Sequence, residues 1–239
     1  MPHPAIWTLL RRHLGMKNLA DYGQSRQKLL GLADLPIHTV LDIGANRGRH
    51  TRMYRRKFPN AKICAIEPVP HLATGIRKWA ENQQGKVEVL NLALANRTGE
   101  TEFFINRRAS IWSTLSVPDG ENEADYERIQ VKVDTLDALS ERLDLREEIV
   151  IKIDTEGADL EVLQGGTATL ARSAAVIIEA VFYPTRYGDD APVFEEIVQA
   201  MSEYGFAYRG NVRCCWSEGV CNAADALFVR RDVACRMAA

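Results

Sequence analysis

The stretch VLDIGANRGRH (residues 40–50) leads from an apolar run into an acid and two glycines. Its apolar start is typical of a buried strand, and Gly44 and Gly48 bracket a turn into a basic helix that begins near Arg49. A glycine turn between a strand and a helix lets the backbone approach a ligand and present amide donors to it. The stretch therefore predicts a ligand site at the end of the first strand of an α/β sheet.

Short apolar runs recur along the chain and alternate with helix-like stretches. They cover residues 38–44, 61–68, 86–94, 101–106, 129–134, 148–154, 174–180, 205–210 and 225–231. This alternation predicts parallel strands joined by crossover helices. Because only a loop separates the last two runs, we expect them to pair antiparallel at one edge of the sheet.

The segments outside these runs suggest how the chain is divided. Residues 1–36 are predicted to form a helical cap that stops at Pro36, and residues 37–239 a single α/β domain. The run 101–106 and the polar stretch 118–128 predict an insertion over the sheet. Residues 158–172 predict one helix.

Composition excludes several classes of protein. The 239 residues include 30 Lys and Arg against 32 Asp and Glu, so no global field favours nucleic acid or an anionic membrane. The early apolar run 5–10 is too short for a signal-peptide core or a membrane span. Five cysteines without a CxxC pair fit reduced thiols, and the cluster at 214–221 matches no common zinc pattern. We expect a cytoplasmic protein with no membrane span and no nucleic-acid partner.

Four acids follow apolar runs: Asp42, Glu67, Asp154 and Glu179. Ligands of open parallel sheets lie beyond the carboxyl ends of the strands, where these acids are expected. A single acid there could be a helix cap or a turn residue. Four in one order indicate a site.

The glycine turn and Glu67 together suggest the ligand. Asn46 stands where a dinucleotide fingerprint has its second glycine, so a pyrophosphate is disfavoured. Glu67 follows Asp42 by 25 positions and can accept both hydroxyls of a ribose. S-adenosylmethionine fits, with its ribose on Glu67, its amino-acid end on the glycine turn and Asp42 near its ammonium or sulfonium.

These motifs resemble the FkbM-type methyltransferases, a branch of the class I S-adenosylmethionine-dependent enzymes. The resemblance covers about residues 38–182 and rests on the order of six segments. They are VLDIGANRG (40–48), AIEPVP (65–70), NLALANRTGETEFF (91–104), VKVDTLDAL (131–139), IVIKIDTEGADLEVLQGG (149–166) and VIIEA (176–180). Arg47 stands at a position that is often apolar in the family, and Asp159 replaces the usual glutamate.

The resemblance implies a Rossmann-like fold with a seven-stranded, mostly parallel sheet, an antiparallel last strand and helices on both faces. It also implies O-methylation of hydroxyls on sugars, polyketides or other natural products. The cofactor contacts that it implies, together with two neighbours that we place beside them, are Asp42, Gly44, Ala45, Asn46, Gly48, Glu67, Asn91, Ala93, Ser113 and Asp154.

A hydroxyl acceptor needs a base, because it is a poor nucleophile until its proton is being removed. Asp154 and Glu179 are the candidates, with Glu156 third. Asp154 and Glu179 could instead hold a divalent cation, which we do not favour because two carboxylates without a third make a thin site. Alternatively, Asp154 caps helix 158–172 and orients the cofactor.

Charged and aromatic residues leave the acceptor open. Lys152 is expected to form a salt bridge with the acids around it, and His50 either packs or reaches the pocket mouth. Arg47 and Arg49 lie on a solvated face, or else face the cleft and favour an anionic acceptor such as an acidic sugar. Three aromatic residues could stack on an acceptor ring: Tyr183, Tyr187 and Trp216.

The sequence therefore predicts an S-adenosylmethionine-dependent O-methyltransferase that acts on a hydroxyl of a small molecule, sugar or other natural product. The alternatives are an N- or carboxyl-methyltransferase and a nucleoside-binding domain without catalysis. A nicotinamide dehydrogenase is disfavoured by Asn46. The oligomeric state stays open, and a homo-oligomer is among the options.

Overall fold

The computed structural model describes residues 29–109, 113–115, 117, 122–183 and 192–238. The chain divides into two compact units, Met1–Leu35 and Pro36–Ala239. Of the first unit only the end is described, and it contains a short 3-10 helix, η1 (Leu32–Asp34). Most of the predicted helical cap therefore lies outside the described residues.

The second unit is built on a seven-stranded sheet with the strand order β3-β2-β1-β7-β8-β10-β9. The strands are β1 (Thr39–Ile43), β2 (Lys62–Ile66), β3 (Val87–Leu90), β7 (Ile149–Ile153), β8 (Ser173–Val181), β9 (Phe206–Ser217) and β10 (Val220–Arg230). β10 runs antiparallel to both of its neighbours, and the other neighbouring strands of this sheet pair in parallel. The predicted fold class is confirmed, including the terminal antiparallel pair.

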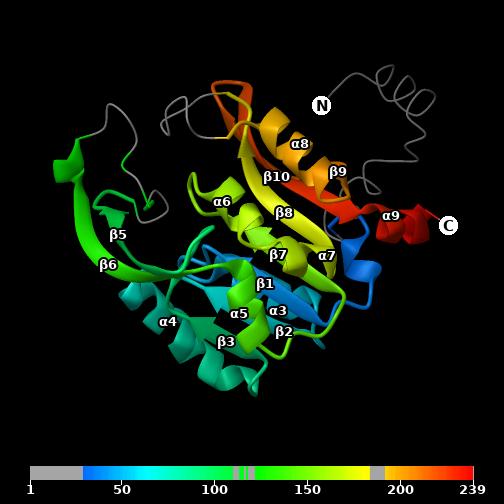
Figure 1. Ribbon diagram of the computed structural model, residues 1–239, viewed down its shortest axis with the longest axis horizontal. Helices are drawn as coiled ribbons and strands as arrows, with labels where there is room; N and C mark the ends of the chain where they lie inside the picture. Colours follow the sequence, from blue (N-terminus) through cyan, green and yellow to red (C-terminus); the bar gives the residue numbers. More distant parts are fainter. Residues whose placement is uncertain (1–28, 110–112, 116, 118–121, 184–191, 239) are drawn as a thin grey trace, which may run out of the picture. The chain divides into compact units, whose positions relative to one another are not determined.

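The strand order reverses between β1 and β7. From β1 the chain moves outward to β2 and β3, and it later returns to the other side of β1 with β7 and β8 (Figure 1). At such a switch point the two sets of crossover helices lie on opposite faces and leave a crevice at the carboxyl ends of the strands. The site predicted after residue 43 lies at this point.

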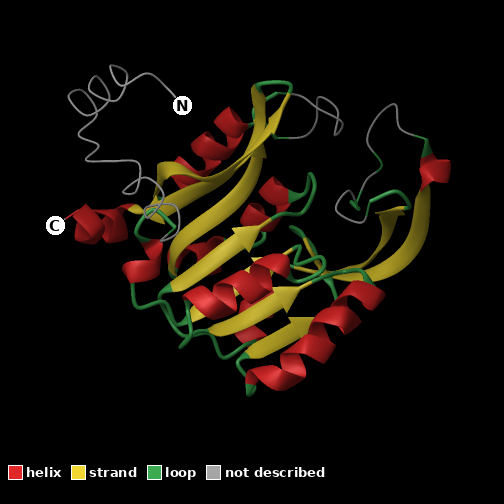
Figure 2. Cartoon of the chain, turned by 180° about the vertical axis from the view of Figure 1, so that it is seen from behind, coloured by secondary structure: helices red, strands yellow, loops and turns green. Residues whose placement is uncertain are grey.

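Helices cover both faces of the sheet. α5, α6, α7 and α8 lie over the face seen in Figure 1, and α3 lies on the face seen in Figure 2. The helices are α3 (Arg49–Lys57), α4 (Pro70–Ala80), η2 (Glu81–Gln83), η4 (Glu123–Asp125), α5 (Leu136–Arg142), α6 (Asp159–Gln164), α7 (Thr167–Ala171), α8 (Phe194–Glu203) and α9 (Arg231–Ala238). None of the helices in the described ranges is long and apolar enough to cross a membrane.

The central strands separate apolar from charged side chains by face. Leu41 and Ile151 belong to a core cluster that also contains Val162 of α6 and Met201 of α8. Because side chains alternate along a strand, Asp42 and Lys152 point to the opposite face, where α3 packs. The sheet thus buries its charges on the α3 side, beneath the carboxyl ends of the strands.

Two predicted strand runs do not join the main sheet. β4 (Ala93–Leu94), β5 (Gly99–Asn106) and β6 (Tyr126–Asp134) form a second sheet in the order β4-β6-β5, and β5 pairs antiparallel with β6. β6 begins inside the stretch predicted as a polar insertion, of which residues 118–121 lie outside the described part. Buried and exposed residues alternate in β6, as expected for a sheet with one packed face rather than a doubly covered parallel strand.

The single helix predicted over 158–172 is wrong. α6 and α7 are separated by Gly165 and Gly166, each of which weakens a helix by about 1 kcal/mol relative to alanine. A Cβ on Gly165 would lie 2.3 Å from the Ala95 carbonyl oxygen, and one on Gly166 would lie 2.6 Å from a Leu136 methyl. The two glycines let this segment pack closely against its neighbours.

Candidate active site

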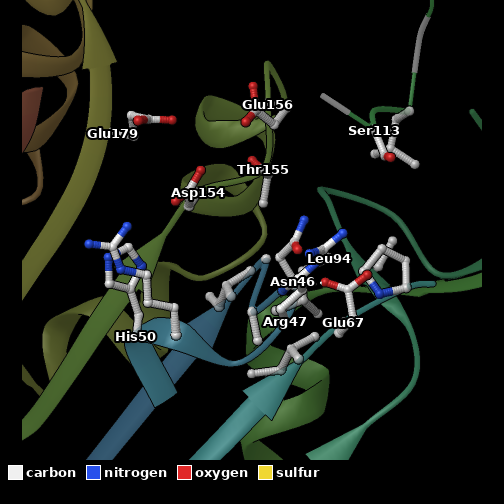
Figure 3. Close-up of a pocket in the computed structure, with 18 of the residues that line it drawn as sticks. Asn46, Arg47, His50, Glu67, Leu94, Ser113, Asp154, Thr155, Glu156 and Glu179 are labelled. Carbon is white, nitrogen blue, oxygen red and sulfur yellow. Dashed lines mark hydrogen bonds between the residues drawn. The ribbon is translucent and has the colours of Figure 1, made fainter. Parts of the chain in front are cut away.

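A cavity of about 730 Å³ lies at the carboxyl ends of the strands. Its wall follows the strand order, from Glu67 after β2 and Gly44 after β1 to Asp154 after β7, Glu179 on β8 and Arg213 on β9. Figure 3 shows the carboxylates of Asp154, Glu156 and Glu179 on one side and Asn46, Arg47 and Glu67 on the other. The cavity therefore spans the switch point and has two chemically different ends.

The glycine turn is shaped first by the protein's own backbone. Gly44 has a φ of +77°, and a Cβ there would lie 1.8 Å from the Asp154 carbonyl oxygen. The amides of Gly44 and Ala45 both donate to the Ile66 carbonyl at 3.0 Å. Gly44 is thus required because the end of β7 comes close to it. The sequence predicted a different reason for a glycine here, the close approach of a ligand.

Glu67 is held by two backbone amides. Its Oε2 accepts from the amide of Asn46 at 2.6 Å, and its Oε1 accepts from the amide of Val69 at 2.8 Å. The side chain is 3% exposed, and this burial raises the pKa of Glu67 to about 7 against the two hydrogen bonds. Because each carboxylate oxygen has two lone pairs, one on each oxygen remains for a ligand.

The structure brings most of the predicted site residues together. Those that line the cavity are Gly44, Ala45, Asn46, Glu67, Ala93, Ser113, Asp154 and Glu179. They come from both sheets, since Ser113 follows β5 and its Oγ accepts from the Asn106 amide at 3.2 Å. Arg47, Arg49 and His50 also line the cavity, so the first turn of α3 faces the cleft.

Asp42, Gly48 and Asn91 are not among the lining residues. Asp42 is 1% exposed and accepts from the Thr51 hydroxyl at 2.5 Å; burial raises its pKa. Gly48 is the N-cap residue of α3, and the Asn91 amide donates to the carbonyls of Glu67 and Pro68 at 2.9 and 2.8 Å. Of the three, Asn91 contacts lining residues directly, because Glu67 and Pro68 both line the cavity.

A buried lysine neutralises the acids at the other end, as the sequence predicted. Lys152 is 1% exposed, and its ammonium lies 3.2 Å from Asp154 Oδ2, 3.2 Å from Asp225 Oδ1 and 3.0 Å from the Ile153 carbonyl oxygen. The contacts with the two aspartates are ion pairs, and the contact with the carbonyl is a hydrogen bond that the ammonium donates. Burial lowers the pKa of Lys152, but the charges of Asp154 and Asp225 outweigh it and hold this pKa well above the usual value.

Asp154 does not cap the helix that follows it. The N-cap residue of α6 is Ala158, without a side-chain hydrogen bond, and the amide and hydroxyl of Thr155 donate to Asp159 instead. The Asp154 carboxylate is instead committed to the ion pair with Lys152. The capping alternative is therefore wrong.

Glu179, which lines the cavity, has a carboxyl group with a strongly raised pKa. It lies on β8 opposite Asp225 of β10. Burial is the main cause that raises the pKa of Glu179 to about 8, and the charge of Asp154 is the second. At neutral pH Glu179 is therefore mostly protonated, beside an Asp154 that is paired with an ammonium.

A third carboxylate completes the acid cluster. One carboxylate oxygen each from Asp154, Glu156 and Glu179 lies within 4.8 Å of the others, so the group could hold a metal ion. The sequence-based objection that only two carboxylates were available is therefore removed. Among the described residues no second group of three such ligands occurs, and the thiols of Cys214, Cys215 and Cys221 are free.

Several lining residues were missed by the sequence analysis. Arg213 and Cys215 of β9 and Ala223 of β10 line the cavity, and Asp225 of β10 holds Lys152. A signal was present in Asp225, a charged residue at the start of an apolar run, but its partner depends on strand pairing. The predicted stacking residues Tyr183 and Trp216 are exposed and not among the lining residues, and Tyr187 lies outside the described residues.

Known proteins resemble this chain in sequence. The family model described as Methyltransferase FkbM domain matches residues 42–208. The 2-O-methyltransferase NoeI of Sinorhizobium fredii is 25% identical over 166 residues, which cover 64% of this chain and 67% of that protein. Methyltransferase sdnD of Sordaria araneosa is 32% identical over 170 residues, 56% of this chain and 62% of that protein.

Two further matches extend the comparison. The hexuronic acid methyltransferase AglP of Haloferax volcanii is 28% identical over 138 residues, 58% of this chain and 54% of that protein. The crystal structure of Methyltransferase FkbM from Methylobacillus flagellatus superimposes with a TM-score of 0.54 at 14% identity, over 81% of this chain and 44% of that one, and this likeness shows the fold. The chain thus matches 54–67% of the length of these three curated relatives.

The family model covers more than half of the chain and includes the glycine turn, Glu67, Asp154 and Glu179. The seven-stranded sheet and the cavity at its switch point agree with it. The resemblance seen in the sequence is thereby confirmed, and the chain belongs to the FkbM methyltransferase family.

Proposed function

We propose that this chain is an S-adenosylmethionine-dependent O-methyltransferase that acts on a hydroxyl of a small molecule, sugar or other natural product. The observation that carries the proposal is the Glu67 carboxylate, fixed by two amides at one end of a cavity whose other end holds the Asp154–Glu179 pair. When bound, S-adenosylmethionine supplies an electrophilic methyl group.

The residues at the Glu67 end fit a nucleoside. Two carboxylate oxygens with free lone pairs match the two hydroxyls of a ribose. Apolar Leu94 lies near Glu67 in Figure 3, and Ala93 and Phe103 also line the cavity, so these side chains suit a base ring. The volume of about 730 Å³ lies within the range of small-molecule sites.

The residues at the acid end suit removal of a proton. A carboxylate with a pKa of about 8 is a stronger base than an ordinary glutamate and is partly ionised near neutral pH. We assign Glu179 as the base that takes the acceptor's hydroxyl proton. Asp154 acts on Glu179 through its charge, and Lys152 keeps Asp154 in place.

A divalent cation at Asp154, Glu156 and Glu179 is the alternative route to an activated hydroxyl. We favour the base because Lys152 already supplies positive charge to this cluster from within the protein. The name of one relative, a 2-O-methyltransferase, supports transfer to oxygen. N- or carboxyl-methylation needs no strong base, so the basicity of Glu179 would have no role in either reaction. The cytoplasmic location and a homo-oligomer stay predictions.

Two measurements test the proposal. Calorimetric titration of the purified protein with S-adenosylhomocysteine should show one site, and the Glu67→Ala variant should lose it. Release of S-adenosylhomocysteine from S-adenosylmethionine should then depend on a hydroxyl compound from a panel of sugars and alcohols. Binding of S-adenosylhomocysteine without turnover of hydroxyl, amine or carboxyl acceptors would instead favour a nucleoside-binding domain. Absence of binding would refute the proposal that S-adenosylmethionine is the cofactor.

A further inference from the structure

We propose that the methyl acceptor carries an oxyanion, a carboxylate or a phosphate, which Arg49 and Arg213 bind at the acid end of the cavity. This inference rests on the proposed function and names the substrate class of the same site. It would make Arg49 and Arg213 residues that determine acceptor specificity.

Three arginines line the cavity without forming an ion pair with any described residue. Arg47, Arg49 and Arg213 come from the glycine turn, the first residue of α3 and the middle of β9, and all three are exposed. In the described part of the chain, none of them forms an ion pair, whereas Arg128, Arg142, Arg230 and Arg236 do. Their guanidinium groups are therefore available to a bound anion.

Other arginines of α3 are occupied by the protein. The Arg52 guanidinium lies 4.9 Å from the centre of the Trp79 ring and donates to the Arg47 carbonyl. Arg55 donates to the Pro59 carbonyl at 3.1 Å. Arg52 and Arg55 are thus held by contacts within the protein, whereas Arg49, at the cavity-facing end of α3, forms no ion pair with any described residue.

Strand pairing places Arg213 at the acceptor end. Glu179, Asp225 and Arg213 are register partners on β8, β10 and β9, so their side chains point to the same face of the sheet. Asp225 is already paired with Lys152 and forms no ion pair with Arg213. β9 is five strands from β2 in the sheet order, about 24 Å at about 4.8 Å per strand, which separates Arg213 from the ribose end.

The cofactor cannot satisfy all three arginines. S-adenosylmethionine has one carboxylate, and Figure 3 shows Arg47 beside Asn46 and Glu67, at the cofactor end. Figure 3 shows His50 on the side of Asp154, and Arg49 lines the cavity from the same first turn of α3. This leaves Arg49 and Arg213 for the second ligand of the cavity.

The chemistry of guanidinium groups defines the class of that ligand. An arginine binds carboxylate or phosphate with two parallel hydrogen bonds, and each such bond is stronger than one between neutral groups. An acceptor with an oxyanion on one side and its hydroxyl near Glu179 would span the charged row from Arg213 to Glu179. A neutral sugar would leave both guanidinium groups without an ion pair.

The test is a calorimetric titration of the full-length protein saturated with S-adenosylhomocysteine. The probes are D-glucuronate, D-glucose 6-phosphate and D-glucose. We expect at least one anionic probe to bind about tenfold or more tightly than glucose. A difference of this size is typical of one charge-assisted hydrogen bond. The two anions distinguish a carboxylate acceptor from a phosphate acceptor.

Matched variants locate the binding. Arg213→Gln and Arg49→Gln should each weaken the anion about tenfold, and higher salt should weaken it in the unchanged protein. Arg209→Gln on β9 and Arg56→Gln on α3 remove the same charge from exposed residues that are not among the lining residues, and should leave binding unchanged. All four variants should keep the affinity for S-adenosylhomocysteine.

Each result decides something specific. Equal binding of glucose and both anions, or equal losses in the matched controls, would overturn the oxyanion proposal while S-adenosylhomocysteine binding upholds the methyltransferase. Loss of S-adenosylhomocysteine binding in Arg213→Gln would assign that residue to the cofactor and overturn its role in the acceptor site. Failure of the unchanged protein to bind S-adenosylhomocysteine would remove the proposed function itself.

Discussion

The two ends of the cavity are built in different ways. The Glu67 end is built mainly from backbone groups. Two amides hold the Glu67 carboxylate, and a glycine turn packs against the end of β7. At the opposite end the protein offers side chains, with Lys152 between two aspartates and Glu179 and Arg213 along one row. The backbone contacts of the Glu67 end do not depend on the side chains of the acid end. Side chains at the acid end can therefore be substituted without altering the glycine turn.

The difference also appears in the protonation of the two glutamates. Burial raises the pKa of Glu67 to about 7, and two amide hydrogen bonds act against this rise. Burial raises the pKa of Glu179 to about 8, and the charge of Asp154 adds to the rise. Both pKa values are thus raised, and the amide hydrogen bonds limit the rise at Glu67.

Glu179→Gln should have the largest effect, and it should affect the rate without affecting binding at the Glu67 end. Removal of a general base costs about 10²- to 10⁴-fold in rate, so kcat should fall by that factor while S-adenosylhomocysteine still binds. Steady-state kinetics and calorimetry measure the two effects. Glu195→Gln, an exposed residue of α8, is the matched control, and unchanged kcat in Glu179→Gln would exclude Glu179 as the base.

Glu67→Gln should act at the other end alone. The amide keeps one acceptor oxygen but places a donor against a backbone N–H, so the affinity for S-adenosylhomocysteine should fall roughly 100-fold. The rate at saturating cofactor should change much less. Glu88→Gln, which removes a surface carboxylate paired with Lys62, should bind normally; an equal loss there would point to a general defect.

The pH dependence of the rate should follow the acid end. Because Glu179 must be deprotonated to accept a proton and its pKa is about 8, kcat/KM should rise up to tenfold per pH unit below pH 8 and level off above it. Profiles between pH 6 and 9.5 measure this. A flat profile through pH 8 would favour Asp154 as the base instead.

The stability should respond to pH in the opposite direction. A glutamate with a folded-state pKa above the unfolded value of 4.5 favours folding while protonated and loses that contribution as pH rises through the folded pKa. The Tm without cofactor should therefore fall between about pH 5 and pH 8. Glu179→Gln should flatten this fall, and a Tm that rises over the whole interval would contradict the pKa values of both glutamates.

Removal of divalent cations should have the smallest effect. If Lys152 supplies the positive charge at the acid cluster, dialysis against EDTA should change kcat less than about twofold, whereas loss of a catalytic metal removes several kcal/mol of stabilisation. Activity is measured before and after return of Mg²⁺. A large loss that Mg²⁺ restores would make Asp154, Glu156 and Glu179 a metal site.

The sequence predicted the main sheet because its strands are continuous apolar runs, and it predicted Lys152 because a lysine among such neighbours needs counterions. It set residues 101–106 apart as an insertion but did not separate 129–134 from the main sheet, because an apolar run does not state which sheet it joins. Gly165 and Gly166 were visible, but the close approach of Ala95 that exploits them was not. Asp225 and Arg213 depend on the pairing of β8, β10 and β9, which no local pattern encodes.

The β9–β10 hairpin has a consequence for engineering. It follows the last parallel strand in the chain, forms one edge of the sheet and supplies Arg213, Cys215 and Ala223 to the cavity wall. A hairpin grafted from a relative would exchange these side chains in a single replacement and leave the Glu67 end of the cavity intact. Asp225 is the one residue such a graft must keep, since without it Lys152 would lose half of its counter-charge.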